Sequence, residues 1–290
     1  MHCVTRPTAP FVTKDQRLRV HQIPAAQDNL VWLVEYARGE CAVIDGPSAV
    51  EALEYCKRRG LTITTILNTH VHPDHVGINR DLLRRGMLEG IRVVGERGTA
   101  RQVPGITEAV QDGDSVWLGQ CEGRVLLTEG HIDGHVSYLF SDVLFCGDTL
   151  FAGGCGYLFD GPPGKMHRSL QRLISLPEDT KVCCAHEYTE DNLRFAHSLE
   201  PDSGALLDRI RKVLDIRGRG GCTVPSTIGA ERSTNPFVRQ QSAVLRKRVE
   251  AAFPGEDLAS PEKLFGATRR LKDSKAYRAY PWPPPALPQG

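Results

Sequence analysis

Several kinds of sequence feature are missing from this chain, and each absence excludes a class of protein. No apolar run is long enough to cross a membrane, and residues 1–17 lack an apolar core followed by a small-residue cleavage site. We therefore expect a cytoplasmic protein with no membrane partner. Lysine and arginine do not form blocks with interleaved aromatic residues, and the formal net charge is only +1. We therefore expect no nucleic-acid partner.

Cysteine motifs and nucleophile motifs are missing as well. The nine cysteines are an odd number and no two of them have Cys-x-x-Cys spacing, so we predict reduced thiols rather than disulfides or a cysteine zinc site. The sequence contains no Gly-x-Ser-x-Gly elbow and no His-Glu-x-x-His motif of the helical zinc sites. The motif that remains to be explained is rich in histidine and aspartate.

The composition provides enough apolar sequence for one large domain with an appendage. The 290 residues are 40% hydrophobic and 24% charged, which is ordinary for a globular protein. Short apolar and β-branched runs predict strands at 17–24, 30–36, 41–45, 63–67, 91–94, 115–118, 124–129, 136–140, 143–146 and 181–184, with a loop at 104–114. Helices are predicted at 48–59, 78–85, 167–175 and 189–197. Because helices fall between groups of strands rather than after each strand, we predict a layered α/β sandwich.

The character of the sequence changes at residues 200–201. From there the chain is helical and more charged, with helices predicted at 204–216, 240–252 and 261–276. We therefore divide the chain into an N-terminal extension (1–16), an α/β domain (17–199) and a helical domain (200–280). The proline-rich residues 281–290 are predicted to form a disordered tail.

The sequence Thr-His-Val-His-Pro-Asp-His at residues 69–75 follows a predicted buried strand and concentrates metal-binding side chains. His70 and His72 are two residues apart, which in extended backbone places both imidazoles on one face. The proline after His72 ends the strand, and the turn returns Asp74 and His75 towards the same point, just ahead of the next predicted helix. A polar loop with hydrogen-bonded histidines is the alternative. Four such donors within six residues favour a metal site.

Three further strand ends carry one donor each. His131, Asp148 and His186 each follow an apolar strand and then a glycine or alanine. The small residue lets the backbone crowd near a metal without a side chain in the way. Taken singly, each of these residues is more often structural, as a cap or a hydrogen-bonded imidazole. Together with the first motif they make seven donors, enough for two adjacent metal ions that share one carboxylate.

These motifs resemble those of the metallo-β-lactamase superfamily and, more narrowly, those of the hydroxyacylglutathione hydrolase (glyoxalase II) family. The resemblance rests on the motif at 69–75 and on Gly130-His-Ile-Asp-Gly-His135, Gly147-Asp-Thr-Leu-Phe151 and Ala185-His-Glu-Tyr-Thr189. It continues through Thr223-Val-Pro-Ser-Thr227, Asn235-Pro-Phe237 and Arg269-Arg-Leu-Lys-Asp273. It implies a four-layer αββα metallo-β-lactamase sandwich, with a C-terminal helical domain that holds glutathione.

Carried over by position, the resemblance implies two divalent metal ions. One would be held by His70, His72 and His131, and the other by Asp74, His75 and His186, with Asp148 bridging both. His135 would orient a ligand rather than bind metal. Zinc is the expected metal, although iron or manganese can occupy the same donors.

The implied reaction is hydrolysis of an S-2-hydroxyacylglutathione, such as S-D-lactoylglutathione, to glutathione and a 2-hydroxy acid. A hydroxide that bridges the metal ions would attack the thioester carbonyl. Asp74 and Asp148 are the expected catalytic residues, and a thiolate leaving group makes a strong general acid unnecessary.

The resemblance also implies contacts with glutathione by Tyr188, Asn192, Arg269 and Lys272. The last two could meet the glycyl carboxylate through charge-assisted hydrogen bonds. Tyr157 is a further candidate contact, at a position where the family usually has lysine or arginine, and Phe159 lacks the hydroxyl of the usual tyrosine. We therefore expect a higher Michaelis constant for glutathione thioesters than in relatives with a basic residue at 157.

Other functions are compatible with parts of this pattern. A mononuclear-iron persulfide dioxygenase of the same fold would use two histidines and the aspartate at one iron, whereas the complete set Asp74, His75 and His186 favours a hydrolase. A nuclease would need a basic surface, which the composition does not predict. A non-catalytic protein with structural metals would more typically have a closed, cysteine-rich site. A hydrolase of a different thioester stays open, and we expect a monomer.

Overall fold

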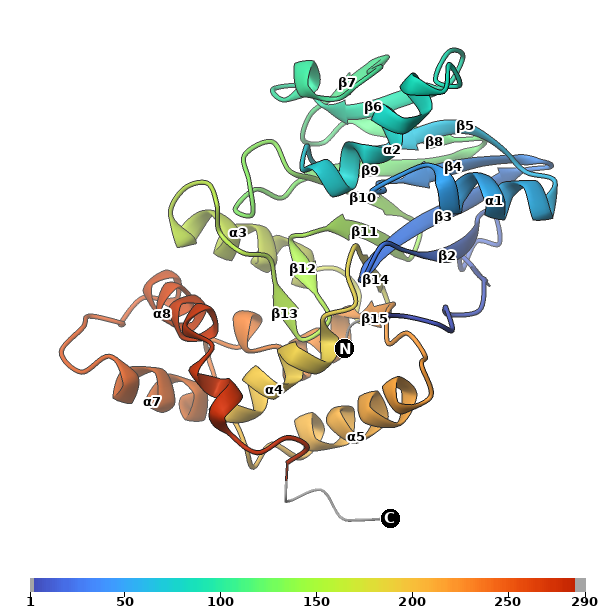
Figure 1. Ribbon diagram of the computed structural model, residues 1–290. Helices are drawn as coiled ribbons and strands as arrows, with labels where there is room; N and C mark the ends of the chain where they lie inside the picture. Colours follow the sequence, from blue (N-terminus) through green and yellow to red (C-terminus); the bar gives the residue numbers. More distant parts are fainter. Residues whose placement is uncertain (1–2, 285–290) are drawn as a thin grey trace.

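The computed structural model describes residues 3–284 and contains two β-sheets packed face to face (Figure 1). The first sheet has the order β1-β2-β3-β4-β5-β6-β7. Its strands are β1 (Phe11–Val12), β2 (Arg19–Ala25), β3 (Asn29–Ala37), β4 (Glu40–Ile44), β5 (Thr62–Leu67), β6 (Arg92–Glu96) and β7 (Glu108–Val110). The second sheet has the order β15-β14-β11-β10-β9-β8. Its strands are β8 (Ser115–Leu118), β9 (Cys121–Leu127), β10 (Val136–Phe140), β11 (Val143–Gly147), β14 (Lys181–Cys184) and β15 (Ser226–Thr227).

The first sheet buries both of its faces, and β3 shows how the sequence achieves this. Trp32 and Val34 belong to the apolar core between the two sheets, whereas Val31 and Leu33 belong to the core under the outer helices. Successive side chains of a strand point to opposite faces, so a continuous apolar run serves both layers. The helices on the outer face are α1 (Val50–Arg59) and α2 (Pro73–Arg84).

The second sheet and its helix complete the sandwich. Tyr138, Phe140 and Phe145 of β10 and β11 are fully buried in the core between the sheets. Trp32 of β3 joins the two sheets, because its ring lies 6.3 Å from that of Phe145 and its Nε1 donates to the Cys184 carbonyl at 2.9 Å. Helix α3 (Pro163–Ile174) packs its apolar side into the same cluster. This helix–sheet–sheet–helix order confirms the predicted four-layer fold.

Several element boundaries differ from the prediction. Helix α2 begins at Pro73 rather than at 78, and α3 begins at Pro163 rather than at 167. Proline is favoured at the first helical position because its missing N–H would have no intrahelical acceptor there. The predicted loop at 104–114 contains β7. The short elements β12 (Leu150–Phe151), β13 (Gly154–Cys155), β15 and α6 (Ile228–Thr234) were not predicted, since none is long enough to show a clear period.

After β14 the chain is mainly helical, as predicted, with helix ends shifted by a few residues. The helices are α4 (Thr189–Leu199), α5 (Gly204–Gly218), α6, α7 (Ala243–Ala252) and α8 (Pro261–Ser274). A fully buried carboxylate, that of Glu231 on α6, ties this region to the sandwich. It accepts hydrogen bonds from Arg209 Nη2 at 2.6 Å, the Gly153 amide at 2.8 Å and Asn235 Nδ2 at 2.9 Å. Gly153 lies in the turn of the β12–β13 hairpin, so the helices hold that hairpin directly.

The N-terminal segment is part of the folded structure. β1 pairs with β2 as the edge of the first sheet, and Thr8 Oγ1 donates to the Val224 carbonyl at 2.7 Å. The predicted tail at 281–290 lies mostly outside the described residues. Within residues 3–284, no helix has both the length and the apolar character needed to span a bilayer.

Candidate metal centre

The histidine motif lies where β5 gives way to α2. His72 is the N-cap of α2 and Pro73 its first residue, so Asp74 and His75 lie in the first turn of the helix rather than in a turn ahead of it. His70 and His75 are buried, and their rings are 3.8 Å apart. The short distance between strand end and helix start therefore brings the donors together, as predicted, although the local structure is different.

Glycines let the other donors approach. A Cβ atom on Gly147 would lie 2.4 Å from Thr69 Oγ1, and one on Gly156 would lie 2.0 Å from the Asp148 carbonyl oxygen. Gly147 also has a φ of +46°, which favours glycine. The small residue beside Asp148 is therefore required by space and by backbone conformation, as the sequence pattern indicated.

Three ring nitrogens form the first group. His72 Nδ1 lies 3.0 Å from His70 Nε2 and 3.0 Å from His131 Nε2. All three donor atoms lie within 4.8 Å of one another. Imidazole nitrogens that converge in this way can coordinate one metal ion.

A second group is formed by Asp74, His75 and His186. Asp74 Oδ2 lies 3.7 Å from His75 Nε2 and 3.4 Å from His186 Nε2. The three donor atoms again lie within 4.8 Å of one another. The two groups together contain six of the seven predicted donors.

Asp148 is the seventh donor, and its two carboxylate oxygens face different groups. Oδ1 lies 3.5 Å from His75 Nε2 and 3.4 Å from His186 Nε2. Oδ2 lies 3.5 Å from His131 Nε2, in the first group. Such a carboxylate can serve both groups at once.

Outer partners fix which nitrogen of each imidazole faces inward. His75 Nδ1 donates to Asp45 Oδ2 at 2.9 Å, and His186 Nδ1 donates to Asp28 Oδ1 at 2.8 Å. An ionised carboxylate only accepts, so Nδ1 carries a proton in both rings and Nε2 is the nitrogen that faces the centre. The Asp45 carboxylate also accepts from Thr69 Oγ1 at 2.7 Å, which holds the start of the motif.

Two more histidines are held by backbone groups. His131 Nδ1 donates to the Tyr157 carbonyl at 2.7 Å, which leaves its Nε2 to face the other two imidazoles of the first group. His135 is not in either group. Its Nε2 accepts from the Asp148 amide at 3.2 Å, so it holds the backbone of that residue from behind.

The charges of the cluster favour a bound cation. Burial alone would raise the pKa of the Asp148 carboxyl, but the imidazoles of His186 and His75 lower that pKa well below its usual range. Burial alone would likewise lower the pKa of His186, but Asp148, Asp28 and Asp74 raise it to about 9. The carboxylates therefore stay ionised and attract positive charge to the centre of the cluster.

Two buried atoms at this centre make no hydrogen bond. Neither His75 Nε2 nor Asp148 Oδ1 has such a partner among residues 3–284. Buried polar atoms are nearly always satisfied, so each exception needs an explanation, and an ion is one of them. Together with the donor chemistry, these two atoms show that the site fits a divalent metal ion.

Comparison with known proteins agrees with this geometry. The family model "Metallo-beta-lactamase superfamily" matches residues 26–120 and 122–186, and "Hydroxyacylglutathione hydrolase C-terminus" matches residues 187–275. A protein of Gloeobacter violaceus named hydroxyacylglutathione hydrolase is 47% identical over 257 residues, which cover 88% of this chain and 98% of that protein. The chain belongs to the hydroxyacylglutathione hydrolase family.

Solved structures share the fold of this family member. ETHE1 from Myxococcus xanthus has a TM-score of 0.58 at 24% identity, over 88% of this chain and 98% of that one, which shows a common fold alone. TTHA1623, in a structure titled as a di-iron-bound form, has a TM-score of 0.51 at 25% identity, over 75% of this chain and 98% of that one. With relatives of up to 47% identity named as hydrolases, the persulfide dioxygenase alternative is not favoured.

Of the predicted substrate contacts, Tyr188 and Tyr157 lie beside the metal ligands. The ring of Tyr188 stacks on that of His186, with centroids 4.9 Å apart, and its hydroxyl donates to Asp28 at 3.3 Å. Tyr157 is 52% exposed and packs against Phe159. The Phe159 ring in turn lies 5.3 Å from the rings of His72 and His131. Two aromatic rings therefore line the approach to the first group.

Two of the other three predicted contacts, Asn192 and Arg269, bind the β12–β13 hairpin, which joins Asp148 to Tyr157 in the chain. Asn192 Nδ2 donates to the Ala152 carbonyl at 3.1 Å, and Arg269 Nη1 donates to the Cys155 carbonyl at 3.2 Å. Both cations already have acidic partners. Arg269 Nε donates to Asp273 at 2.9 Å, and Lys272 Nζ donates to Asp191 at 2.8 Å.

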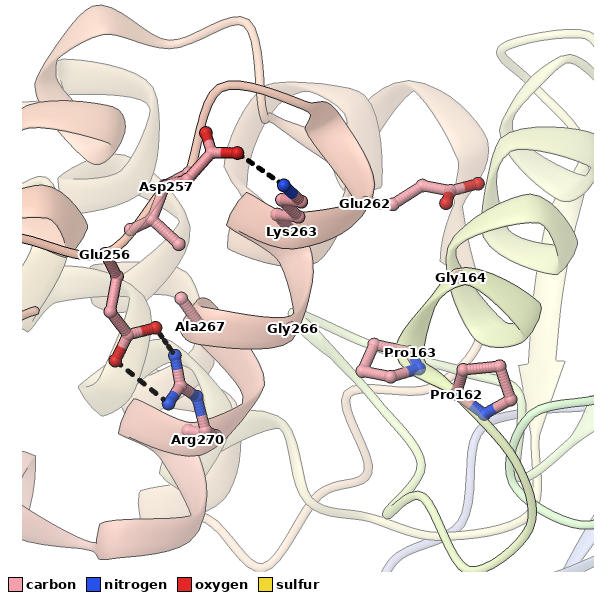
Figure 2. A pocket seen from close by; sticks show the side chains of 11 residues that line it. Pro162, Pro163, Gly164, Glu256, Asp257, Glu262, Lys263, Gly266, Ala267 and Arg270 are labelled. Atoms are coloured by element: carbon pink, nitrogen blue, oxygen red, sulfur yellow. Dashed lines mark hydrogen bonds and ion pairs between the residues drawn. The ribbon is translucent and has the colours of Figure 1, made fainter.

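A separate cavity of about 480 Å³ lies between the start of α3 and α8 (Figure 2). Arg270 pairs there with Glu256, and Lys263 pairs with Asp257. None of the predicted site residues lines this cavity, and its two cations are neutralised by acids in its own wall.

Sequence reasoning missed two functional residues, Asp45 and Asp28. Asp45 directly follows the apolar strand β4 but lacks the preceding glycine or alanine of the other strand-end donors, so only its place at a strand end could have indicated it. Asp28 precedes β3 and reaches His186 across 158 residues of sequence, and no local pattern indicates that contact.

Proposed function

We propose that this protein hydrolyses S-2-hydroxyacylglutathione thioesters, such as S-D-lactoylglutathione, to glutathione and a 2-hydroxy acid. The observation that carries the proposal is the set of seven converging donors, in a chain whose relatives are named hydroxyacylglutathione hydrolase. A structural zinc site is typically closed, four-coordinate and rich in cysteine, whereas this cluster has histidine and aspartate donors and no cysteine.

The proposal includes two metal ions in each chain. His70, His72 and His131 would hold one, and Asp74, His75 and His186 would hold the other, with Asp148 between them. The two directions in which the Asp148 oxygens point support this assignment. Zinc suits nitrogen and carboxylate donors, and iron is compatible too, given the di-iron title of TTHA1623.

Bound at this site, such ions would polarise the thioester carbonyl and lower the pKa of a bound water, so that hydroxide is available to attack that carbonyl. The protein's own groups would keep that arrangement fixed. Asp45 and Asp28 hold the His75 and His186 rings, and His135 holds the backbone of Asp148. Preorganised donors need no rearrangement during the reaction, which is how fixed groups stabilise a developing negative charge.

For the thiol half of the substrate, we assign Tyr157, Tyr188, Asn192, Arg269 and Lys272. Their position around the β12–β13 hairpin, which adjoins Asp148, supports the assignment. Arg269 and Lys272 would meet a carboxylate of glutathione in exchange for Asp273 and Asp191. The division into residues 17–199 for catalysis and 200–280 for glutathione is part of this proposal.

The test is hydrolysis of S-D-lactoylglutathione by the purified protein, followed at the thioester absorbance, with metals quantified on the same sample. Turnover with about two metal ions per chain is the expected result for a two-metal site. Two metals without turnover would move the substrate to a different thioester. One iron per chain without hydrolysis would overturn the proposal.

A further inference from the structure

Outside the metal centre, two buried cysteines lie in contact. Cys41 on β4 and Cys56 on α1 have their Sγ atoms 3.8 Å apart. Both belong to the apolar cluster between the first sheet and helices α1 and α2. A disulfide requires an S–S distance of about 2.05 Å, so the two sulfurs need to approach by less than about 2 Å to form one. No other pair of cysteine thiols within residues 3–284 forms a hydrogen bond.

A cavity gives access to one of the two thiols. It has a volume of about 590 Å³ and lies over β5, between α1 and the end of α2. Cys56 lines this cavity, whereas Cys41 does not and lies behind it. The rest of the wall is mainly apolar, with Leu53, Leu61, Ile63, Leu82, Met87 and Ile91. A small apolar reagent that enters the cavity therefore meets Cys56 first.

The contact also divides the roles of the two thiols. The contact with Cys41 lowers the pKa of Cys56, although burial opposes this. The same contact, together with burial, raises the pKa of Cys41. Since the thiolate is the nucleophile in sulfur chemistry, Cys56 is the attacking group and Cys41 the resolving group.

We propose that Cys56 and Cys41 form a peroxide-reactive dithiol, whose substrate is an apolar organic hydroperoxide. The Cys56 thiolate attacks the terminal peroxide oxygen, the O–O bond breaks, and the alkoxide leaves and takes a proton to become an alcohol. Cys56 is then a sulfenic acid. The Cys41 sulfur attacks the Cys56 sulfur and loses its proton, and hydroxide leaves with that proton as water. Two thiols and one hydroperoxide thus become one disulfide, one alcohol and one water.

The chain carries its own control for this reaction. Cys183 and Cys184 are adjacent on β14, so their side chains point to opposite faces of the strand and are not in contact. Both are buried, like the proposed pair. Trypsin cleaves after Arg38 and Lys57 and after Lys181 and Arg194, so each pair of cysteines lies within one tryptic peptide, at 39–57 and 182–194.

The experiment treats the native, full-length protein with cumene hydroperoxide, blocks the remaining thiols and maps the tryptic peptides by mass spectrometry. Peptide 39–57 is expected to lose the mass of two hydrogen atoms and to regain it with dithiothreitol, while peptide 182–194 stays unchanged. Equal oxidation of both peptides, or of neither, would overturn the proposal. At equal concentration, hydrogen peroxide is expected to react more slowly. A faster reaction with hydrogen peroxide would overturn the assignment of an apolar substrate.

Two variants test the roles of the thiols. In Cys41→Ser, the sulfenic acid on Cys56 has no resolving partner and is expected to be trapped by dimedone. In Cys56→Ser, dimedone is expected to label nothing in peptide 39–57. The reverse pattern would overturn the assignment of Cys56 as the attacking group. Because the wild-type peptide map needs no variant, the proposal remains testable even if a substitution prevents folding.

Discussion

The candidate metal centre and the proposed glutathione-binding region, which contains Arg269 and Lys272, place their charged groups in opposite ways. In the donor cluster, carboxylates hold His75 and His186 from outside, and two atoms that face the centre, His75 Nε2 and Asp148 Oδ1, make no hydrogen bond. In the glutathione-binding region, Arg269 and Lys272 are buried and each is paired with an acid of the same chain. The first region presents unpaired donor atoms to its centre, whereas the cations of the second are neutralised within the chain.

The difference follows from how long each ligand stays. A resident metal ion can be served by donors that have no other partner, because the ligand is present throughout. A substrate enters and leaves, and a buried cation without a partner would be costly in the intervals. The internal acids therefore act as exchangeable partners, and we expect substitutions to have larger effects in the metal centre than around glutathione.

The largest effect should come from Asp148→Ala, because this residue faces both donor groups. We expect kcat for S-D-lactoylglutathione to fall by at least about 10²–10³-fold, the range for losing one group that stabilises transition-state charge. Most of the bound metal should be lost as well, as measured by elemental analysis. Asp133→Ala is the control, since Asp133 is exposed and pairs with Lys165. Unchanged metal content and rate in Asp148→Ala would remove the bridging role.

A smaller loss should follow Asp45→Ala, which removes the acceptor of His75 and Thr69 without removing a donor. Loss of such an outer partner typically weakens metal binding about 10–100-fold. Competition with a chelating dye measures the change. Asp142→Ala is a matched control, because Asp142 is also a buried acid but binds Lys181. Equal weakening in both variants would point to general destabilisation.

The next effect concerns the glutathione-binding region. Arg269→Gln should raise KM for the glutathione thioester about tenfold, which corresponds to roughly 1.4 kcal/mol of binding. Bound metal should stay unchanged. The neighbouring Arg270→Gln removes the same charge from the same helix, but Arg270 pairs with Glu256 in the separate cavity of Figure 2 and should leave KM as it is. A similar rise in both variants would show that only the overall charge of α8 matters.

The buried ammonium group of Lys272 should make KM depend on pH. Burial lowers the pKa of its ammonium group to about 8, even though Asp191 favours the charged form. The other groups that face it are Tyr277, Arg278 and Arg269. Because the charged form is lost as the pH rises through the pKa, KM should increase above about pH 8, with kcat unaffected. Lys272→Arg stays charged and should remove this increase. If KM still increases above about pH 8 in Lys272→Arg, a group other than Lys272 is responsible for the pH dependence.

The smallest effect is expected from Tyr157→Arg, which adds the charge usual in the family at a half-exposed position. KM should fall by a factor of about two to five, since exposed ion pairs contribute up to about 1 kcal/mol. Trp117→Arg is the control, because Trp117 is 50% exposed on β8 and lies outside the site. If KM does not change in Tyr157→Arg, the absence of a basic residue at position 157 does not affect substrate binding.

The contrast between the donor cluster and the region of Arg269 and Lys272 also explains how much of each could be predicted from the sequence. Most of the predicted metal ligands lie at the end of a strand, so spacing and the family resemblance together predicted seven donors, and the structure brings these seven together. The pairing of Arg269 with Asp273 has the i,i+4 spacing that a helix brings together, so the sequence could have predicted it. The pairing of Lys272 with Asp191 could not be predicted, because the two residues are 81 positions apart. Helix starts at Pro73 and Pro163 were placed too late, since an apolar period gives little signal in the first helical turn.

The buried carboxylate of Glu231 limits how this protein can be divided. It satisfies Gly153 in the sandwich and Arg209 in the helices at once. A gene cut after residue 199 would leave the Gly153 amide and its hairpin without this acceptor, right beside Asp148. The helices therefore cannot be exchanged as an independent domain. A chimera that combines them with the sandwich of another family member needs the β12–β13 hairpin from the same parent as the helices.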